Sequence, residues 1–255
     1  MENLVKRIIF DSLEESVYVT AKITRGEDFT DGKPSREVIM KTVNSVVSKG
    51  HLACTEHFTV FIGRMDFTGS FGCNVNSPLV RQNPWFDVTH DGLYVMCNPR
   101  FLIEYFMAND KDTYSEAFTK VCTLYPVPDG YSSEGRKTFF IESNIGCTRE
   151  MNRHRGLSPL ELSTRYLTMT DKDMNFTDSI VEQEYKRAGA LHLYAELLGN
   201  NEPRDLARDI LPLGTRTKCF YTGFDKSWNH YFGLRRNPKT AHPMILDLAN
   251  KIYGV

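Results

Sequence analysis

The chain has 255 residues, of which 41% are hydrophobic and 25% are charged, values close to those of an average soluble globular protein. Its 31 basic and 32 acidic residues nearly cancel, which excludes a polycation built for nucleic acid, so any anion site must come from local clustering. The apolar run 8–10 is too short for a signal peptide, and no stretch approaches the roughly 18 apolar residues of a membrane helix. We therefore expect a cytoplasmic protein without a membrane segment.

The first third of the chain mixes strand and helix patterns. Residues 16–23 alternate between apolar and polar side chains, which predicts a strand. Pro34-Ser35 opens a predicted helix whose apolar residues recur at helical spacing until Gly50 ends it. Residues 57–63 are β-branched and aromatic and predict a second strand.

The middle of the chain contains two loop-like stretches. Residues 69–92 are rich in Gly, Asn and Pro, and Asp91-Gly92 is a turn signal before an apolar stretch at 93–96. Asn98-Pro99 leads into a predicted helix. Residues 126–136 form the second predicted loop.

The last half begins with a predicted strand at 138–141 and continues with a long predicted helix at 178–198. A short helix begins at Pro203, a strand covers 219–222, and a last helix covers 243–252. Because strands and helices do not alternate regularly, we expect an α+β fold, with a mixed or antiparallel sheet packed with helices, rather than a doubly wound parallel sheet.

Six cysteines are spread along the chain without a CxxC pair, so we expect no structural zinc and no other bound metal. In a chain of this length we expect free, buried thiols rather than three disulfides. The cysteines are Cys54, Cys73, Cys97, Cys122, Cys147 and Cys219.

Residues 149–166 hold four arginines and two glutamates, a local charge of +2. The planar fork of arginine suits phosphates and planar heterocycles because it donates several hydrogen bonds at once. Ser158-Pro159-Leu160-Glu161 also fits a helix start, with serine as the cap and proline in the first turn. Two alternatives stay open, a capped helix after a solvated basic loop or an anion site at a helix N-terminus beside arginines.

A second basic region spans residues 203–236, where seven basic residues minus three acidic ones give +4. Arg208 and Arg235 stand in apolar surroundings, where a buried charge needs an anionic partner. The alternative for Arg208 is an ordinary salt bridge to Asp205 or Asp209.

Arg153-His154-Arg155, then seven residues, then Ser163, resembles the signature of the flavin-dependent thymidylate synthases. The same family order recurs over about residues 50–66 and 138–250. The other matching segments are Glu56-His57 with the strand after it, Arg165-Tyr166, Ala207–Pro212, Thr222-Gly223, Trp228–Phe232, Leu234-Arg235 and Ala241–Pro243.

The resemblance implies one domain over residues 1–255, in which 67–137 is an insertion carried by longer family members, with Asn98-Pro99-Arg100 as its recognisable part. Family members are homotetramers whose active sites are shared between chains. They methylate dUMP to dTMP with methylenetetrahydrofolate as carbon donor, and FAD reduced by NADPH supplies the hydride. We therefore expect dUMP, folate and nicotinamide partners, and no nucleic acid.

The resemblance also assigns roles to residues. Arg235 is the expected catalytic residue, because positive charge near N3 and O4 of uracil pushes electron density toward C5. Neither Ser163 nor any cysteine is expected to act as a nucleophile. The expected dUMP ligands are Glu150, Arg153, Glu161, Ser163, Arg165, Arg208 and Arg235. The expected FAD contacts are His57, Arg153, His154, Arg155, Glu161 and His230.

Three positions depart from the pattern of short family members. Those members carry glutamine at the position of Glu150 and asparagines at the positions of Phe224 and His230. The His230 ring can replace an amide as a hydrogen-bond donor, but the Phe224 ring cannot. The FAD contacts of this last segment are therefore open.

Two other functions are compatible with parts of the sequence. A flavin enzyme that modifies C5 of another pyrimidine nucleotide, such as a UMP methylase or a dUMP hydroxymethylase, would need the same nucleotide clamp. A non-enzymatic RNA- or DNA-binding module using the two basic stretches would be colourless, and its binding would weaken steeply with salt.

Overall fold

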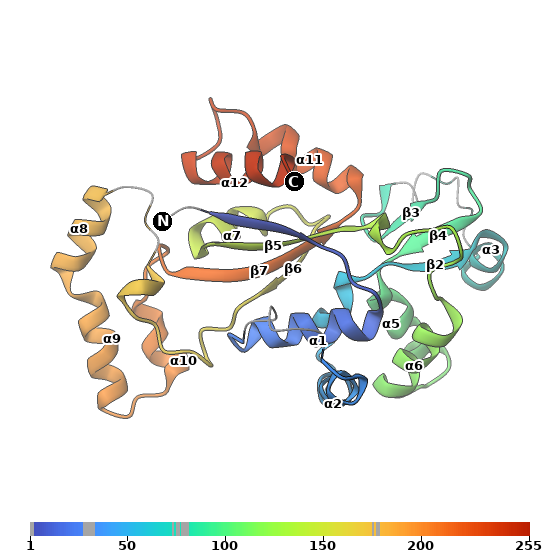
Figure 1. Cartoon of the computed structure of the whole chain (residues 1–255), viewed down its shortest axis with the longest axis horizontal. Coiled ribbons are helices and arrows are strands. Elements are labelled where there is room, and N and C mark those ends of the chain that lie inside the picture. Colours follow the sequence, from blue (N-terminus) through green and yellow to red (C-terminus); the bar gives the residue numbers. More distant parts are fainter. Residues whose placement is uncertain are drawn as a thin grey trace.

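Two antiparallel sheets organise the chain, with helices packed around both of them (Figure 1). The computed structural model describes residues 3–27, 34–72, 74, 77, 82–174, 176 and 179–255. The larger sheet has strand order β1-β5-β7-β6 and the smaller one β2-β4-β3. The fold is therefore α+β, as the irregular order of the predicted elements indicates. The strands are β1 (Leu4–Ile8), β2 (Val60–Gly63), β3 (Phe86–Val88), β4 (Tyr94–Cys97), β5 (Lys137–Asn144), β6 (Ser158–Glu161) and β7 (Arg216–Gly223).

The larger sheet is covered on both faces (Figure 1). One face carries α7 (Ile145–Met151), α11 (Asp225–Arg235) and α12 (Pro243–Tyr253), and the other carries α1 (Leu13–Thr24) and the 3-10 helix η1 (Leu52–His57). The alternation of side chains along β7 separates these two layers. Cys219 and Tyr221 belong to the core under α7, α11 and α12, whereas Phe220 belongs to the core shared with α1.

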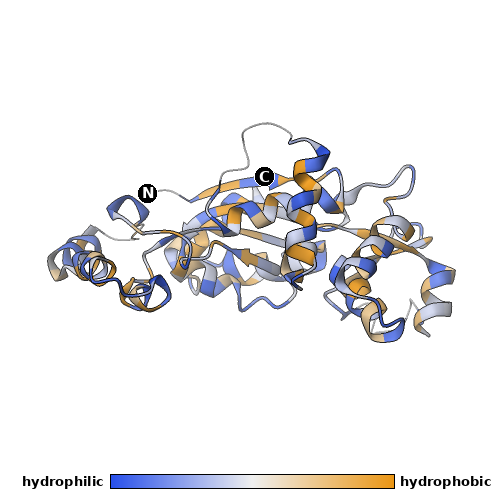
Figure 2. Ribbon diagram, turned by 90° about the horizontal axis from the view of Figure 1, so that it is seen from below, coloured by the Kyte–Doolittle hydropathy of each residue, from blue (hydrophilic) through white to orange (hydrophobic). Residues whose placement is uncertain are grey.

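The remaining helices lie beside the smaller sheet, behind α1 or in an arm that contains α8 and α9, at the left of Figure 1. Orange hydrophobic and blue hydrophilic residues alternate along the helices in Figure 2, as expected for amphipathic helices. None of the helices in the described ranges is both long and apolar enough to cross a membrane. These elements are α2 (Arg36–Val47), α3 (Arg64–Phe71), α5 (Pro99–Asn109), α6 (Tyr114–Leu124), η2 (Ser133–Gly135), η3 (Asp171–Asp173), α8 (Ser179–Ala188), α9 (Ala190–Gly199), α10 (Arg204–Ala207) and η4 (Arg208–Ile210).

Helix α11 is anchored to the sheet by Trp228, which is 1% exposed. Its Nε1 donates to the carbonyl oxygen of Lys137 on β5 at 3.2 Å. The edges of Phe139 and Tyr231 meet its indole ring at centroid distances of 4.9 Å and 5.8 Å. This packing fixes the helix that carries His230 and Arg235 against the sheet.

The predicted strand at 16–23 is wrong, because these residues form most of α1. Ser12 caps the helix by accepting a hydrogen bond from the backbone N–H of Glu15 at 3.1 Å. Buried Leu13, Val17 and Thr20 recur at a spacing of three to four residues. Within eight residues the same apolar positions fit both an alternating strand pattern and a helical pattern. The segment forms a helix because its buried side chains pack against the larger sheet at helical spacing.

The predicted helix start at Ser158 is also wrong. Residues 158–161 form β6, which pairs with β7 from Ser158 opposite Thr222 to Glu161 opposite Cys219. β6 lies at an edge of the sheet, where Pro159 is tolerated although it lacks a backbone donor. The anion-site alternative for this segment therefore has no helix N-terminus to support it.

Two other predictions are correct only in part. The predicted strand at 57–63 begins only at Val60, since His57 ends η1. The predicted long helix at 178–198 is interrupted at Gly189, whose φ of +67° separates α8 from α9, and residue 178 lies outside the described residues. The predicted loop at 69–92 contains the end of α3 and all of β3, while residues 73, 75–76 and 78–81 are not described.

The other predicted elements are confirmed. Ser35 and Asn98 cap α2 and α5 by accepting backbone N–H groups, and α12, β5 and β7 include the predicted residues. Gly92 takes the left-handed conformation that the Asp91-Gly92 turn requires, with φ of +72°. The 126–136 loop contains only the short η2.

The described cysteines are free thiols, as the sequence predicts. Four are buried and Cys122 is half-buried, while Cys73 lies outside the described residues. Burial raises the pKa of Cys54 and of Cys147 to about 11 and that of Cys122 to about 12. Burial also raises the pKa of Cys97 and Cys219, so the described thiols stay protonated at neutral pH.

Candidate functional site

The first group of expected site residues lies where the end of α7 meets the end of α11; we call it the α7–α11 cluster. α7 follows β5 directly, and the Asn144 side chain caps it by accepting from the backbone N–H of Cys147 at 2.9 Å. α11 follows β7, so the two central strands position both helices on one face of the sheet. The cluster consists of Glu150, Arg153, His154, His230 and Arg235.

Arg235 is held by two hydrogen bonds and one ion pair to residues of α7 and of the turn after it. Its Nη1 lies 3.0 Å from the Glu150 carboxylate, and its Nη2 donates to the Glu150 carbonyl oxygen at 3.3 Å. Its Nε donates to His154 Nε2 at 2.9 Å. A guanidinium has five N–H donors, so two are left for a ligand after the contacts within the described ranges. The positive charge also complements the C-terminal end of the α7 dipole.

His154 is the most enclosed member of the cluster, with 7% of its surface exposed. Its ring meets the edges of His230 and Tyr231 at centroid distances of 5.9 Å and 5.0 Å. Burial, reinforced by the positive charge of Arg235, lowers the pKa of His154 to about 4. His154 is therefore neutral at physiological pH.

Glu161 on β6 connects this cluster to the next segment of the chain. Its Oε1 accepts from Thr148 Oγ1 at 2.9 Å, two residues before Glu150 on α7. The Thr148 carbonyl oxygen accepts in turn from the Tyr221 hydroxyl at 3.1 Å. Sequence reasoning missed Thr148, because a threonine inside a helix gives no signal without its partner on another strand.

The second group lies just after β6; we call it the β6–η4 group, and it consists of Ser163, Thr164, Arg165 and Arg208. The backbone N–H of Ser163 donates to the Thr24 carbonyl oxygen at 3.1 Å, which ties the segment to the end of α1. Ser163 Oγ accepts from the backbone N–H of Arg165 at 3.4 Å. The Arg165 side chain is exposed and has no partner among the residues that the structure describes.

Arg208 reaches this group from η4. Its Nη1 donates to Thr164 Oγ1 at 3.4 Å. Across the described ranges, no ion pair joins Arg208 to Asp205 or Asp209, so the salt bridge that the sequence left open as an alternative is not formed. One uncharged hydroxyl leaves most of the Arg208 charge available for an anion.

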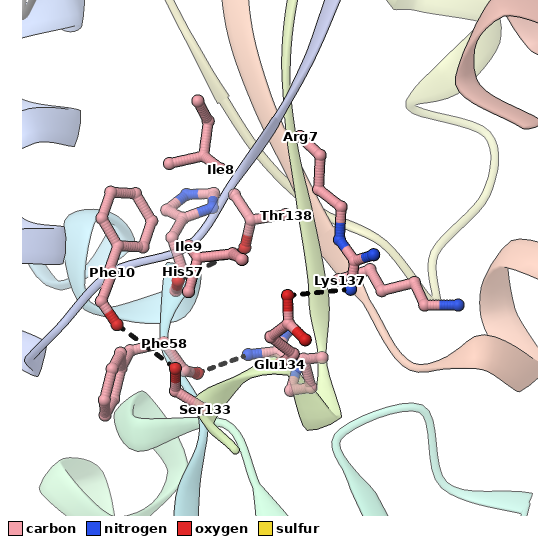
Figure 3. Close-up of a pocket in the computed structure, with 11 residues that line it drawn as sticks. Arg7, Ile8, Ile9, Phe10, His57, Phe58, Ser133, Glu134, Lys137 and Thr138 are labelled. Atoms are coloured by element: carbon pink, nitrogen blue, oxygen red, sulfur yellow. Dashed lines mark hydrogen bonds and ion pairs between the residues drawn. The ribbon is translucent and has the colours of Figure 1, made fainter. Parts of the chain in front are cut away.

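His57 lies on the face of the larger sheet opposite α7 and α11, because its ring lies 5.9 Å from that of Phe220, which points away from those helices. Figure 3 shows His57 among residues that include Phe10 and Thr138. His57 is 1% exposed, and its Nδ1 lies 2.8 Å from Thr222 Oγ1. Burial lowers the pKa of His57 to about 3. Its Nε2 has no partner within the described residues. Successive side chains of β7 point to opposite faces of the sheet, so Thr222 points to the face opposite Tyr221. This alternation is the signal in the sequence that could have placed Thr222 on the same face as His57.

Within one chain the structure therefore brings together only some of the expected residues. Glu150, Arg153, His154, His230 and Arg235 form one cluster, and Ser163, Arg165 and Arg208 form a neighbouring group joined to it through Glu161. His57 belongs to neither.

The turn after α7 has the chemistry that a dinucleotide cofactor needs. Arg153 pairs with Glu150 at 3.1 Å, but its side chain is 71% exposed, and Arg155 is exposed as well. Two exposed guanidinium groups two residues apart are suitable donors for a diphosphate, so these residues fit FAD. The described residues contain no group of three side chains placed to hold a metal ion.

A family model matches the part of the chain that contains the α7–α11 cluster and the β6–η4 group. Residues 135–255 match the family described as thymidylate synthase complementing protein. The match covers slightly less than half of the chain, and it is a similarity of these residues to that family. All the expected site residues except His57 lie inside this family segment.

Curated relatives are similar to part of the chain. The flavin-dependent thymidylate synthase of Synechocystis sp. is 30% identical over 139 residues, which cover 46% of this chain and 65% of the relative. The flavin-dependent thymidylate synthase of Pyrococcus abyssi is 33% identical over 110 residues, which cover 38% of this chain and 45% of the relative. The matches therefore span less than two thirds of each relative's length.

A solved structure of the UMP/dUMP methylase PolB from Streptomyces cacaoi, bound with 5-Br UMP, also overlaps with the chain. Its TM-score is 0.38 at 21% identity, and the overlap covers 47% of this chain and 66% of that chain.

Proposed function

We propose that the protein is a flavin-dependent thymidylate synthase that converts dUMP to dTMP, with methylenetetrahydrofolate as carbon donor and NADPH as reductant. The observation that carries the proposal is Arg235, a guanidinium with two free donors, held by Glu150 and neutral His154 inside the family segment.

Arg235 would act on the pyrimidine. Negative charge develops near N3 and O4 when C5 attacks the carbon donor, and a fixed cation stabilises that charge without reorganising during the reaction. Arg235 is only 17% exposed, so its charge is screened less than that of a surface arginine.

The β6–η4 group would bind the nucleotide phosphate. Arg165 offers an unpaired guanidinium, Arg208 offers donors beyond its bond to Thr164, and Ser163 offers a hydroxyl. Glu161 would line the nucleotide site between this group and α7, and Glu150 and Arg153 would complete it from the cluster. No nucleophile from the protein is needed, in keeping with the buried, protonated thiols.

Arg153 and Arg155 would hold the diphosphate of FAD, and His230, which is exposed on α11, would face the cofactor. Bound FAD, reduced by NADPH, would supply the hydride that completes the methyl group. Glu161 and His154 would border the same space, and no metal is required.

We propose that the complete site forms between chains of a homotetramer. Within one chain His57 lies on the other face of the sheet from Arg235, so a neighbouring chain would supply the missing groups. The same proposal takes the chain as one domain over residues 1–255 with 67–137 as an insertion. A core that includes residues before, within and after the insertion supports it: Phe10, Val60, Leu102, Phe118, Phe140 and Phe220.

The test uses the purified protein. We expect a yellow protein whose visible spectrum is that of oxidised flavin, and a product with the mass of dTMP after incubation with dUMP, methylenetetrahydrofolate and NADPH. A product from UMP, or one carrying a hydroxymethyl group, would favour a related C5-modifying enzyme. A colourless protein whose affinity for DNA or RNA falls steeply with salt would refute the proposal. Fractionation of the host cell should place the protein in the cytoplasm.

A further inference from the structure

The contact between Arg235 and His154 fixes which nitrogen of the imidazole carries the proton. Arg235 Nε–H is a donor, so His154 Nε2, 2.9 Å away, must accept with its lone pair. A neutral imidazole has one N–H, which must then be on Nδ1. The ring is thus in the Nδ1–H tautomer, and it cannot be protonated without placing two donors face to face.

We propose that His154 is a positioning residue for Arg235, and that its role as a hydrogen-bond acceptor orients the guanidinium toward the pyrimidine. This inference rests on the proposed function for the catalytic importance of Arg235, but the contact itself does not. It also changes the role expected for His154, because a ring that is 7% exposed and turned onto Arg235 offers little surface to a flavin.

Glu150 and His154 contact different nitrogens of the Arg235 guanidinium. The Glu150 carboxylate and carbonyl oxygen hold the two terminal nitrogens, and His154 holds Nε. A guanidinium held only at its terminal nitrogens can still pivot about the axis through them, whereas the third contact stops this rotation. The loss of the acceptor should therefore affect turnover more than nucleotide affinity.

Protonation of His154 would release Arg235. The titratable and charged groups that face the ring come from the α7 end and from α11: Glu150, Arg153, His230, Tyr231 and Arg235. Only the carboxylate favours the protonated ring, and it is already shared by two arginines. The acceptor should therefore persist until the solution is well below neutral pH.

Two substitutions separate an acceptor role from simple packing. The amide oxygen of His154→Gln can accept from Arg235 Nε and does not titrate, whereas the side chain of His154→Leu fills similar space without an acceptor. We expect His154→Leu to lower kcat by about 10- to 100-fold, the range for one hydrogen bond to a charged group, with dUMP affinity within about threefold. His154→Gln should restore most of kcat and remove the acid limb of the pH profile that His154 causes.

Two readouts test the contact without any turnover. In the ¹⁵N spectrum of the free protein, the His154 ring should show the Nδ1–H tautomer from pH 8 to about pH 5. The Arg235 Nε–H should exchange slowly in the wild type and in His154→Gln, and rapidly in His154→Leu. His192→Gln is the matched control, because this histidine is 79% exposed on α9 and should change none of these signals.

An Nε2–H tautomer, or equal Arg235 Nε–H exchange in all three proteins, would overturn the proposal even in an active enzyme. Equal kcat values for His154→Leu and the wild type would do the same. If the tautomer and exchange are as expected but no dTMP forms, the proposed function fails and the positioning contact stands.

Discussion

The two arginine-rich groups of the family segment differ in how much of their bonding the chain itself satisfies. In the α7–α11 cluster, Arg235 is only 17% exposed and makes two hydrogen bonds and one ion pair to α7 and the turn after it. In the β6–η4 group, Arg165 is exposed without a partner in the described ranges, and Arg208 bonds one threonine hydroxyl. The first group is therefore organised without a ligand, whereas the second has side-chain donors that the ligand of the proposed site would satisfy.

The largest expected effect is that of Arg235→Ala. It should lower kcat by roughly 100- to 1,000-fold, as the loss of one preorganised charge donor does elsewhere, while FAD content stays within about twofold. Steady-state kinetics and flavin absorbance measure the two quantities. Equal activity in the variant would contradict the catalytic role, and Arg236→Ala, on the neighbouring exposed residue, is the control.

The substitution Gly156→Ala, in the turn after α7, should disturb the α7–α11 cluster and leave the β6–η4 group unchanged. A Cβ added in Gly156→Ala would lie 2.6 Å from Ser227 Oγ and 3.0 Å from its Cβ on α11, so the turn must move. We expect a loss of about 1 to 3 kcal/mol in the free energy of unfolding, measured in urea.

The matched control for Gly156→Ala is Gly233→Ala, which lies on α11. Apart from its chain neighbours and the backbone of its own helix, no described atom lies within 4 Å of the added Cβ. It should raise stability by roughly 0.5 to 1 kcal/mol, because alanine favours a helix interior. A destabilised Gly233→Ala protein would show that α11 tolerates no substitution, and the Gly156 result would then say nothing specific about the turn.

Arg165→Ala should show the opposite behaviour from Arg235→Ala. The dUMP dissociation constant should rise by roughly 10- to 30-fold through the loss of one phosphate contact. The free energy of unfolding should stay within about 0.5 kcal/mol, because an exposed side chain without a native partner contributes little to it. Calorimetric titration and urea unfolding measure the two effects. Unchanged dUMP affinity would mean that the β6–η4 group is not the phosphate site.

The last expected effect is the pH dependence of stability. Unfolded histidine has a pKa near 6.5. The folded pKa values of His154 and His57 are about 4 and about 3, so the unfolded state binds more protons below neutral pH. Stability should be complete only above about pH 7.5 and should fall by about 2 kcal/mol per histidine between pH 7 and pH 5. His154→Gln should remove one of the two contributions, and an unchanged slope in urea titrations would contradict the assignment.

The structure places Arg153, His154 and Arg235 around Glu150, whereas their roles toward a nucleotide or a flavin stay predictions. The local structure was predicted less well. The helix start expected at Ser158 is instead a strand, since pairing with β7 outweighs local capping chemistry. Local patterns do not contain the position of a partner strand that is distant in sequence.

The positions of His57 and Thr148 could not be predicted for the same reason. The sequence marked His57 by its motif, but only the alternation along β7 determines the face of the sheet on which it lies. Thr148 carried no signal, since its importance comes from Glu161 across the sheet edge. The contacts that organise the cluster depend on tertiary pairing, which the spacing of residues along the chain does not encode.

The position of Trp228 has a practical consequence. The chain has two tryptophans, and the other, Trp85, is 44% exposed near the smaller sheet. A Trp85→Phe protein would retain a single buried indole, two turns before Arg235 on the same helix. The fluorescence intensity of Trp228 would then report changes around α11 when each small molecule is added, without a label. Stopped-flow mixing would give the rate of each change as well as its size.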